Sequence, residues 1–242
     1  MGKLYVIGIG PGSVENMSLR AYNTIKKCNV IVGYTKYIEM IKELIEGKEV
    51  HSTGMKSEED RCKLALELAK DNDVALVSTG DSGIYGMAGL ILELSTKEDN
   101  IEIIPGITAS SAAGSVLGAP LMHDNCNISL SDLLTPYEDI KKRVDMAAAS
   151  DFIISLYNPR SKGRPHYLKE CIEIIKKYRD GKTPIAVVEH ALREGQNIQK
   201  FTLEDFNDEV VNMMSIVIIG NSKSYWKDGY FITPRGYKIG NK

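Results

Sequence analysis

The sequence predicts an α/β fold with two α/β domains. Short, nearly continuous apolar runs alternate with amphipathic stretches in the first half of the chain, as expected for parallel strands covered by helices on both faces. The segment 118–125 contains Gly and Pro, interrupts this alternation and is followed by a second α/β region. A chain of 242 residues is long enough for two small domains. We therefore expect an N-terminal domain over residues 1–121 and a C-terminal domain over residues 122–242.

The first domain is expected to hold a parallel sheet, because its strands are separated by helices. The predicted strands are Leu4–Gly8, Val30–Gly33, Val74–Ser78 and Ile101–Ile104. Ser18 stands where it can cap a helix over Leu19–Lys27. Ser57 and Asp60 resemble a capping box ahead of a second helix, in which Leu64, Ala65 and Leu68 repeat at helical spacing.

The second domain is expected to mix strand directions. Its predicted strands are Ile128–Leu130, Phe152–Tyr157, Ile185–Glu189, Gln199–Leu203 and Ser215–Gly220, and its predicted helices are Tyr137–Ala148 and Tyr167–Tyr178. Polar and apolar residues alternate in Gln199–Leu203, which favours an antiparallel strand with one solvated face. The tail 225–242 carries the only Trp and several Tyr, and we expect it to pack on the core or on a second subunit.

Composition excludes several classes of protein. The formal net charge of −2 argues against nucleic acid held by bulk electrostatics. Four widely spaced cysteines predict buried thiols in a reducing compartment and exclude an iron–sulfur cluster with clustered ligands. The four histidines show no paired metal-binding spacing, so no metal site is expected. Because no leader and no apolar run of about 20 residues is present, we expect a cytoplasmic protein without a membrane span.

A glycine-rich loop follows the first predicted strand, with the sequence Gly-Ile-Gly-Pro-Gly over residues 8–12. A dinucleotide fingerprint begins in the same way, but Ser13 stands at its third glycine position. Pro11 also removes a backbone donor that a pyrophosphate would use. The second strand ends in Gly33-Tyr34 without the acidic residue of an NAD site. What remains is a bare loop, which is either a structural turn or a place where a wide ligand approaches the backbone.

Two further loops, 77–86 and 105–113, end the third and fourth predicted strands. In the first of them Asp81 lies between glycines, where a carboxylate can bind an amine or a pair of hydroxyls. The alternative is that Asp81 caps the following helix. The second loop leads into a run of very small residues that leaves room for a ligand or for close helix packing. Because ligands bind at the carboxyl ends of strands in open α/β sheets, the three loops together predict a ligand site.

The chain resembles the tetrapyrrole methyltransferase family, which contains the uroporphyrinogen-III and precorrin methyltransferases. The resemblance extends from Val6 to about Asn221. Its markers are Gly8–Gly12, Gly80-Asp81, Pro105–Ala109, Tyr157–Pro159 and Val188–Ala191. Three more stretches resemble the members that methylate carbon 17 of precorrin-3B or cobalt-factor III, with ring contraction, in cobalamin biosynthesis. They are Val32–Tyr37, Ile128–Pro136 and Tyr157–Pro165.

The resemblance implies the tetrapyrrole methylase fold, with an S-adenosylmethionine cleft between two α/β domains, and a homodimer. Matching motif positions assign the cofactor site to Pro11, Thr79, Gly80, Asp81, Ile84, Thr108, Ala109, Asn158 and Ala191. Asn158 stands where related enzymes often carry Met, and Ala191 stands where glycine is frequent. Asp81 would complement a positive sulfonium and an amino group.

The acceptor would be a tetrapyrrole rich in carboxylates, which requires cations. Gly10 and Gly12 in the first loop, and Arg160, Lys162 and Arg164 in the loop 158–165, are the candidate substrate-binding residues. A solvated surface loop is the alternative for the second group. His190 lies near the inferred cleft and is a further candidate. Tyr34, beside the first glycine loop, is the candidate catalytic proton donor or acceptor, and the alternative is a buried, hydrogen-bonded tyrosine.

Three hypotheses of function follow. The first is the carbon-17 methyltransferase, for which the sequence does not distinguish precorrin-3B from cobalt-factor III. The second keeps the fold and changes the acceptor to another precorrin, a diphthamide precursor or ribosomal RNA. The third is a tetrapyrrole- or cofactor-binding protein without turnover.

Overall fold

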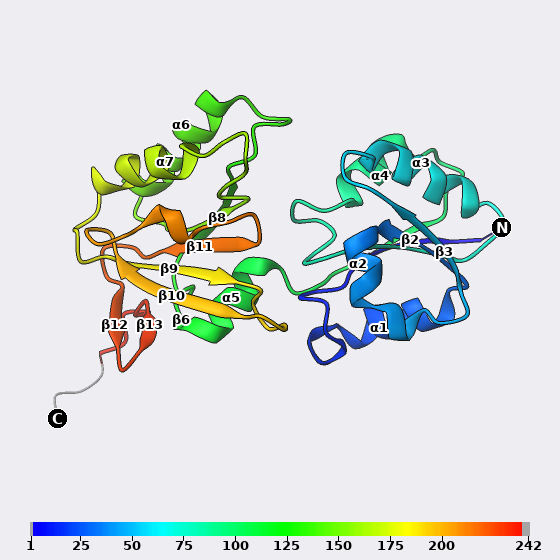
Figure 1. Ribbon diagram of the computed structural model, residues 1–242, viewed down its shortest axis with the longest axis horizontal. Helices are drawn as coiled ribbons and strands as arrows, with labels where there is room; N and C mark the ends of the chain where they lie inside the picture. Colours follow the sequence, from blue (N-terminus) through cyan, green and yellow to red (C-terminus); the bar gives the residue numbers. More distant parts are fainter. Residues whose placement is uncertain (1, 239–242) are drawn as a thin grey trace. The chain divides into compact units, whose positions relative to one another are not determined.

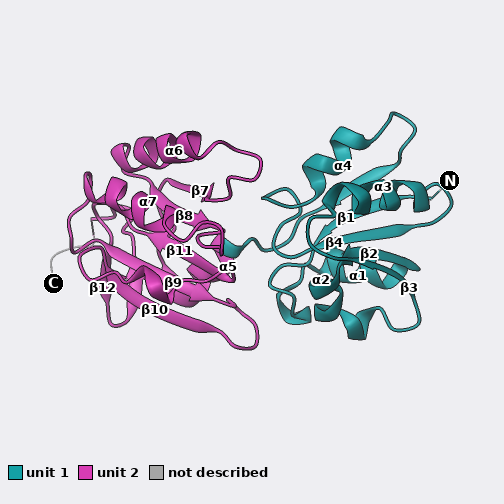
Figure 2. Ribbon diagram, turned by 45° about the horizontal axis from the view of Figure 1, so that its top comes forward, with its two compact units in different colours: residues 1–109 teal, residues 110–242 magenta. Residues whose placement is uncertain are grey.

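The computed structural model describes residues 2–238. The chain divides into two compact units, 1–109 and 110–242 (Figure 2). The division falls earlier than the boundary expected after Leu121. The reason is that residues 110–121 pack with the second unit: Ser110 of α5 (Ala109–Leu117) is hydrogen-bonded to the Tyr157 hydroxyl, and β6 (Gly118–Ala119) pairs with β13 (Tyr230–Ile232).

Unit 1 is built on a parallel sheet of five strands in the order β3-β2-β4-β1-β5. The strands are β1 (Leu4–Gly8), β2 (Val30–Tyr34), β3 (Glu49–Thr53), β4 (Val74–Ser78) and β5 (Ile101–Ile104). The four predicted strands and the parallel sheet are confirmed. β3 was not predicted, because it is an edge strand whose polar residues are half-buried or exposed and give no apolar run.

Helices cover both faces of this sheet (Figure 1). One face carries α1 (Leu19–Lys27), α2 (Thr35–Met40) and the 3-10 turns Val14–Asn16 and Lys42–Leu44, and the other carries α3 (Glu58–Leu68) and α4 (Ala88–Leu94). The Oγ of Ser18 accepts a hydrogen bond from Ala21 N at 3.1 Å, which confirms the predicted cap. Ser57 does precede α3, but its side chain makes no capping bond.

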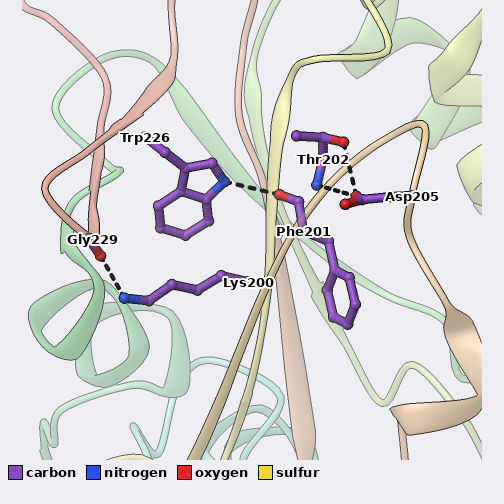
Figure 3. A pocket seen from close by; sticks show the side chains of 6 residues that line it. All are labelled: Lys200, Phe201, Thr202, Asp205, Trp226 and Gly229. Atoms are coloured by element: carbon purple, nitrogen blue, oxygen red, sulfur yellow. Dashed lines mark hydrogen bonds between the residues drawn. The ribbon is translucent and has the colours of Figure 1, made fainter.

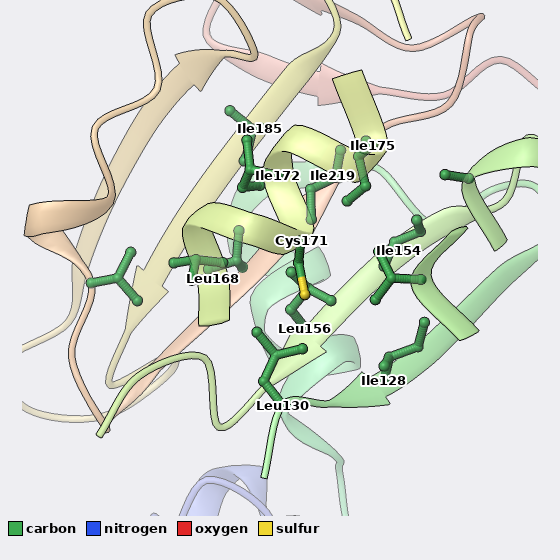
Figure 4. Close-up of a cluster of buried hydrophobic side chains, with 14 of the residues drawn as sticks. Ile128, Leu130, Ile154, Leu156, Leu168, Cys171, Ile172, Ile175, Ile185 and Ile219 are labelled. Atoms are coloured by element: carbon green, nitrogen blue, oxygen red, sulfur yellow. The ribbon is translucent and has the colours of Figure 1, made fainter. Parts of the chain in front are cut away.

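Unit 2 holds a mixed sheet in the order β10-β9-β11-β8-β7. The strands are β7 (Asn125–Ser129), β8 (Ile153–Tyr157), β9 (Pro184–Glu189), β10 (Asn197–Thr202) and β11 (Ser215–Ile219). β10 is antiparallel to β9 and half-exposed, as its alternating sequence predicts. The predicted helices are present as α6 (Tyr137–Ala149) and α7 (Tyr167–Lys176). Both pack on one face of the sheet, where Leu156, Cys171 and Ile172 share a core (Figure 4).

The tail packs on unit 2 as a hairpin of β12 (Tyr225–Lys227) and β13, followed by residues to 238; the predicted tail residues 239–242 lie outside the described part. Phe231 is fully buried. Trp226 Nε1 donates to Phe201 O at 2.9 Å and Lys200 Nζ donates to Gly229 O, so the hairpin covers part of the open edge of β10 (Figure 3). The short 3-10 turn Asp208–Val210 lies between β10 and β11.

Candidate functional site

The three glycine-rich loops of unit 1 meet at one edge of its sheet. They follow β4, β1 and β5, which are neighbours in that order. Because the strands are parallel, their carboxyl ends share an edge. The helices that follow β1 and β4 cover opposite faces of the sheet, so the chain leaves these adjacent strands in opposite directions. Such a topological switch point is where open α/β sheets bind ligands.

Backbone hydrogen bonds join the loops after β1 and β4. Gly10 N donates to Gly80 O at 3.0 Å, and Gly80 N donates to Gly10 O at 2.8 Å, which forms a one-residue antiparallel bridge beyond the parallel strands. Ile9 N donates to Ser78 O at 2.9 Å. The φ angles of Gly10 and Gly80 are 62° and 69°, in the left-handed region that glycine adopts without steric cost.

The loop after β5 closes on the other two through contacts that permit only glycine. A Cβ on Gly106 would lie 2.2 Å from Gly80 O and 2.5 Å from Gly8 O. A Cβ on Gly8 would lie 2.8 Å from Gly106 N. These glycines are therefore required by the approach of three backbones.

Asp81 ties the second loop to the third. Its Oδ1 accepts from Gly83 N at 2.8 Å, and its Oδ2 accepts from Gly106 N at 3.0 Å. Ser82 adds a buried bond from its Oγ to Ile104 O, at 3.1 Å. The residue at the amino end of α4 is Met87, so Asp81 does not cap that helix. The carboxylate stays half-buried at the edge of the sheet.

The candidate residues of unit 1 divide into packed and open positions. Pro11 and Gly12 are buried, and a Cβ on Gly12 would lie 3.0 Å from Met40 Sδ. In contrast, a Cβ on Gly80 would meet only Thr108 Cα, at 3.9 Å. The half-buried or exposed candidates at this edge are Thr79, Gly80, Asp81, Ile84, Thr108 and Ala109. The edge thus offers bare backbone with a carboxylate and two hydroxyls beside it.

Tyr34 ends β2, next to β4, and its side chain is half-buried. Its ring meets Tyr37 edge-on with 5.0 Å between centroids. On α3, the guanidinium carbon of Arg61 lies 6.0 Å from the Tyr34 ring centroid. Sequence reasoning did not select Arg61; the available signal was an arginine on the same helix face as the buried Ala65, four residues later.

Unit 2 brings its own candidates to one edge, at the carboxyl ends of β7, β8 and β9. Asn158 follows β8 with a φ of 49°, and its Nδ2 donates to Ser129 Oγ at the end of β7, at 3.0 Å. Next to it, the hydroxyl of Tyr157 accepts from Ser110 N at 2.9 Å and lies 3.0 Å from Ser110 Oγ. Tyr157 and Ser110 were not among the predicted site residues, because this pairing depends on a fold contact between residues far apart in sequence.

In the basic loop 158–165, both arginines donate hydrogen bonds to backbone carbonyl groups of the protein. Arg160 Nη1 donates to Asp208 O at 2.6 Å. Arg164 donates to Leu130 O and to Asn158 O, and its Nε lies 3.5 Å from a carboxylate oxygen of Asp132. The Arg164 side chain is only 14% exposed. Lys162 is exposed and forms no ion pair with any described residue, so it is the cation of this loop that remains available to a ligand.

His190 and Ala191 lie in the turn after β9. His190 has a φ of 51°, and its Nε2 lies 3.6 Å from Glu189 Oε1. The turn is closed by Arg193 N, which donates to His190 O at 3.1 Å. Both residues are half-buried and lie at the same sheet edge as Asn158.

Across residues 2–238, no group of three or more metal-binding side chains is present, and no helix is long and apolar enough to cross a membrane. Burial raises the pKa of Cys28 and Cys62 to about 11, so these thiols of unit 1 are neutral near pH 7. Neither thiol can therefore serve as a thiolate nucleophile at that pH.

Comparison with known proteins identifies relatives along almost the whole chain. A protein described as a probable cobalt-factor III C(17)-methyltransferase from Salmonella typhimurium is 48% identical over 240 residues, which cover 98% of this chain and 100% of that protein. A cobalt-factor III methyltransferase from Priestia megaterium is 42% identical over 98% of this chain, which spans only 45% of that protein.

Solved structures agree with the sequence matches. The crystal structure of the methyltransferase CobJ has a TM-score of 0.92 and 35% identity, covering 97% of this chain and 100% of that one. A uroporphyrin-III C-methyltransferase from Thermus thermophilus, complexed with S-adenyl homocysteine, has a TM-score of 0.70 and 25% identity, covering 90% of this chain and 97% of that one. The model of the tetrapyrrole (corrin/porphyrin) methylases matches residues 3–207. The chain therefore belongs to the tetrapyrrole methylase family, and the fold and family that the sequence resemblance implied are confirmed.

Proposed function

We propose that this protein transfers a methyl group from S-adenosylmethionine to carbon 17 of cobalt-factor III or precorrin-3B, with ring contraction, in cobalamin biosynthesis. The observation that carries the proposal is the joining of three bare loops at a switch point of the sheet, in a chain 48% identical to a relative of that description over its full length. We further propose that the enzyme acts in the cytoplasm as a homodimer.

The edge of unit 1 fits S-adenosylmethionine. The open position at Gly80 lets a ligand lie against the backbone, and Asp81 places a negative charge beside it. In this proposal Thr79, Ile84, Thr108 and Ala109 line the same ligand, together with Pro11 in unit 1 and Asn158 and Ala191 in unit 2. When bound, the cofactor supplies an electrophilic methyl group on a positively charged sulfur.

The protein's part in the reaction is to position the two reactants. Holding an acceptor carbon in line with the methyl–sulfur bond can contribute about 7–11 kcal/mol without any covalent help from the enzyme. The rigid backbone bridge between Gly10 and Gly80 suits that task, because it fixes the loops before a ligand arrives. The thiols of Cys28 and Cys62 are neutral near pH 7, and this proposal gives them no part in the reaction.

Proton movement during ring contraction is assigned to Tyr34, whose side chain lies at the carboxyl end of β2. Gly10 and Gly12 are assigned to the loop that borders the tetrapyrrole. Lys162 and His190 are the proposed polar contacts from unit 2. Since Arg160 and Arg164 already bind internal acceptors, their proposed effect on the substrate is to hold the shape of the loop around Lys162.

The test is turnover. The protein is incubated with methyl-labelled S-adenosylmethionine and either cobalt-factor III or precorrin-3B, and we expect label in a ring-contracted product. Asp81→Ala should weaken S-adenosylhomocysteine binding by about 1–3 kcal/mol in calorimetry, the scale of a lost charged hydrogen bond. Asp71→Ala, at an exposed position, is the matched control and should leave binding unchanged. Unlabelled products from both tetrapyrroles, beside an active reference enzyme, would refute the proposal.

A further inference from the structure

We propose that Arg61 binds a side-chain carboxylate of the tetrapyrrole and thereby orients the ring beside Tyr34. This inference rests on the proposed function and names a substrate contact in unit 1. Arg61 projects from the first turns of α3 toward the carboxyl edge of β3 and β2, and only 4% of its surface is exposed. A cation at such a position requires an explanation, because burial of an unneutralised charge is costly.

Two of the guanidinium nitrogens are fixed by neutral acceptors. Nε donates to Thr53 Oγ1 at 2.7 Å, and Nη2 donates to Gly54 O at 2.8 Å. Neither partner carries a charge. The remaining nitrogen, Nη1, has no partner among the described residues, yet it is not sealed from solvent. The side chain is therefore held in one orientation, and its Nη1 can still donate a hydrogen bond to a ligand.

Arg179 is the other buried arginine, and unlike Arg61 it has a carboxylate partner. Arg179 is 8% exposed, its Nη1 lies 3.2 Å from Asp151 Oδ1, and it donates to four backbone carbonyl groups of unit 2. Its charge is matched inside the protein. In contrast, no carboxylate of the described residues lies within 4.0 Å of Arg61, although α3 begins with three acidic residues. An arginine fork without a carboxylate is suited to receive one from a ligand.

The surroundings of Arg61 are polar on the same face of the sheet. Thr53 and Tyr34 are register partners on β3 and β2, and Ser78 ends the next strand, β4. Alternate residues of a strand share a face, and the buried Val32 and Leu76 place this row on the α3 side. Ser78 is 5% exposed, and its Oγ has no partner within the described chain. The row runs from Arg61 to the glycine loops, since β4 is the neighbour of β1.

These positions give Arg61 a definite task. A tetrapyrrole that lies against the glycine loops carries its carboxylates on its periphery, away from the reacting carbon. A carboxylate bound at Nη1 would fix the rotation of the ring about its own axis, and with it the carbon presented to the methyl donor. Because the guanidinium carbon lies 6.0 Å from the Tyr34 ring centroid, the same contact places the macrocycle next to that hydroxyl-bearing residue.

The test compares Arg61→Gln with wild-type protein in equilibrium binding of cobalt-factor III, with S-adenosylhomocysteine present. Binding does not require turnover, so the result is independent of the activity assay. We expect the variant to bind the tetrapyrrole about tenfold to a hundredfold more weakly, while its affinity for S-adenosylhomocysteine changes less than twofold. Arg20→Gln, which removes an exposed partner of Glu102, is the control and should leave both affinities unchanged.

Substrate variants distinguish direct binding of a carboxylate by Arg61 from a purely structural role of this residue. Monoamides of cobalt-factor III, each with one carboxylate made neutral, are bound to both proteins. One monoamide should lose about tenfold in affinity for the wild type and nothing further for Arg61→Gln, because the partner of that carboxylate is already absent. Arg61→Lys, which keeps the charge without the fork, should recover part of the affinity. Equal binding of cobalt-factor III to wild type and a folded Arg61→Gln would overturn the inference, as would equal monoamide losses in both. Normal binding without methylation would instead count against the proposed function alone.

Discussion

The two units build their ligand-facing edges by different means. In unit 1 the loops after β1, β4 and β5 are joined mainly by backbone, and the left-handed positions where they meet are Gly10 and Gly80. In unit 2 the corresponding edge is joined by side chains, such as Asn158 to Ser129. Besides Gly195, three left-handed residues after β8 and β9 are not glycines: Asn158, His190 and Leu192 have φ angles of 49°, 51° and 58°.

The two edges differ in the backbone strain at the positions where their loops are joined. A glycine adopts the left-handed region freely, whereas another residue pays about 1–2 kcal/mol there. Unit 1 therefore joins its loops at Gly10 and Gly80 without backbone strain, although Tyr85, later in the loop after β4, has a φ of 54°. Unit 2 keeps strained residues because surrounding bonds hold them, and such strain is frequent at functional sites. We call the joined loops after β1, β4 and β5 the platform of unit 1.

The largest effect is expected from a substitution that forces apart the three loops of unit 1. In Gly106→Ala the new Cβ would lie 2.2 Å from Gly80 O, and this backbone atom cannot move without opening the bridge to Gly10. We expect a loss of about 3 kcal/mol in unfolding free energy, as in severe overpacking, together with loss of S-adenosylhomocysteine binding. Urea unfolding and calorimetry measure both.

Gly89→Ala is the matched control for this substitution. It lies in α4, and nothing lies within 4 Å of the added methyl group. Alanine at an open helical position should stabilise the protein by up to about 1 kcal/mol. If both alanine variants behaved alike, the close approach of the three loops would not be the reason for glycine at position 106.

A smaller effect on stability is expected in unit 2, where the charged side chain of Arg164 binds acceptors within the protein. Arg164→Ala removes donors to Leu130 O and Asn158 O and a side chain 3.5 Å from Asp132. We expect it to lower the unfolding free energy by about 1–3 kcal/mol. Lys162→Ala, two residues earlier and exposed, should change stability by less than about 0.5 kcal/mol and affect only the KM for the tetrapyrrole. Reversed results in chemical denaturation and steady-state kinetics would mean that Arg164, rather than Lys162, is the ligand-binding cation.

The same contrast explains how much the sequence could predict. In unit 1 the close approach of the loop backbones requires glycine, and these glycines can be recognised in the sequence. All four apolar strands of that unit were also predicted. The polar edge strand β3 escaped, because it has no apolar run. In unit 2 the five strands of the larger sheet were predicted, but the short strands β6, β12 and β13 and the internal bonds of Arg160 and Arg164 were not. Their acceptors, Asp208 and Leu130, lie 48 and 34 residues away along the chain, and only the fold brings them together.

Arg61 illustrates a further limit of the same kind. An arginine on an amphipathic helix normally predicts a solvated position. Its burial depends on the loop after β3 folding over α3, and that strand was itself unpredicted. Because the edge strand β3 was not predicted, the burial of Arg61 beside it could not be predicted either.

The smallest expected effect measures the strain in unit 2. Asn158→Ala and Asn158→Gly both lose the 3.0 Å bond to Ser129 Oγ, and they differ only by a Cβ in a backbone held at a φ of 49°. The glycine variant should be more stable by about 1 kcal/mol, because it adopts this conformation without steric cost, although part of the gain is offset by the greater entropy of its unfolded chain. Paired urea titrations resolve a difference of that size. Equal stabilities would mean that the backbone at Asn158 relaxes once its side-chain bond is gone, so that the bond to Ser129 creates the strain. A more stable glycine variant would mean that the turn itself is fixed by the surrounding strands, as the platform of unit 1 is by its glycines.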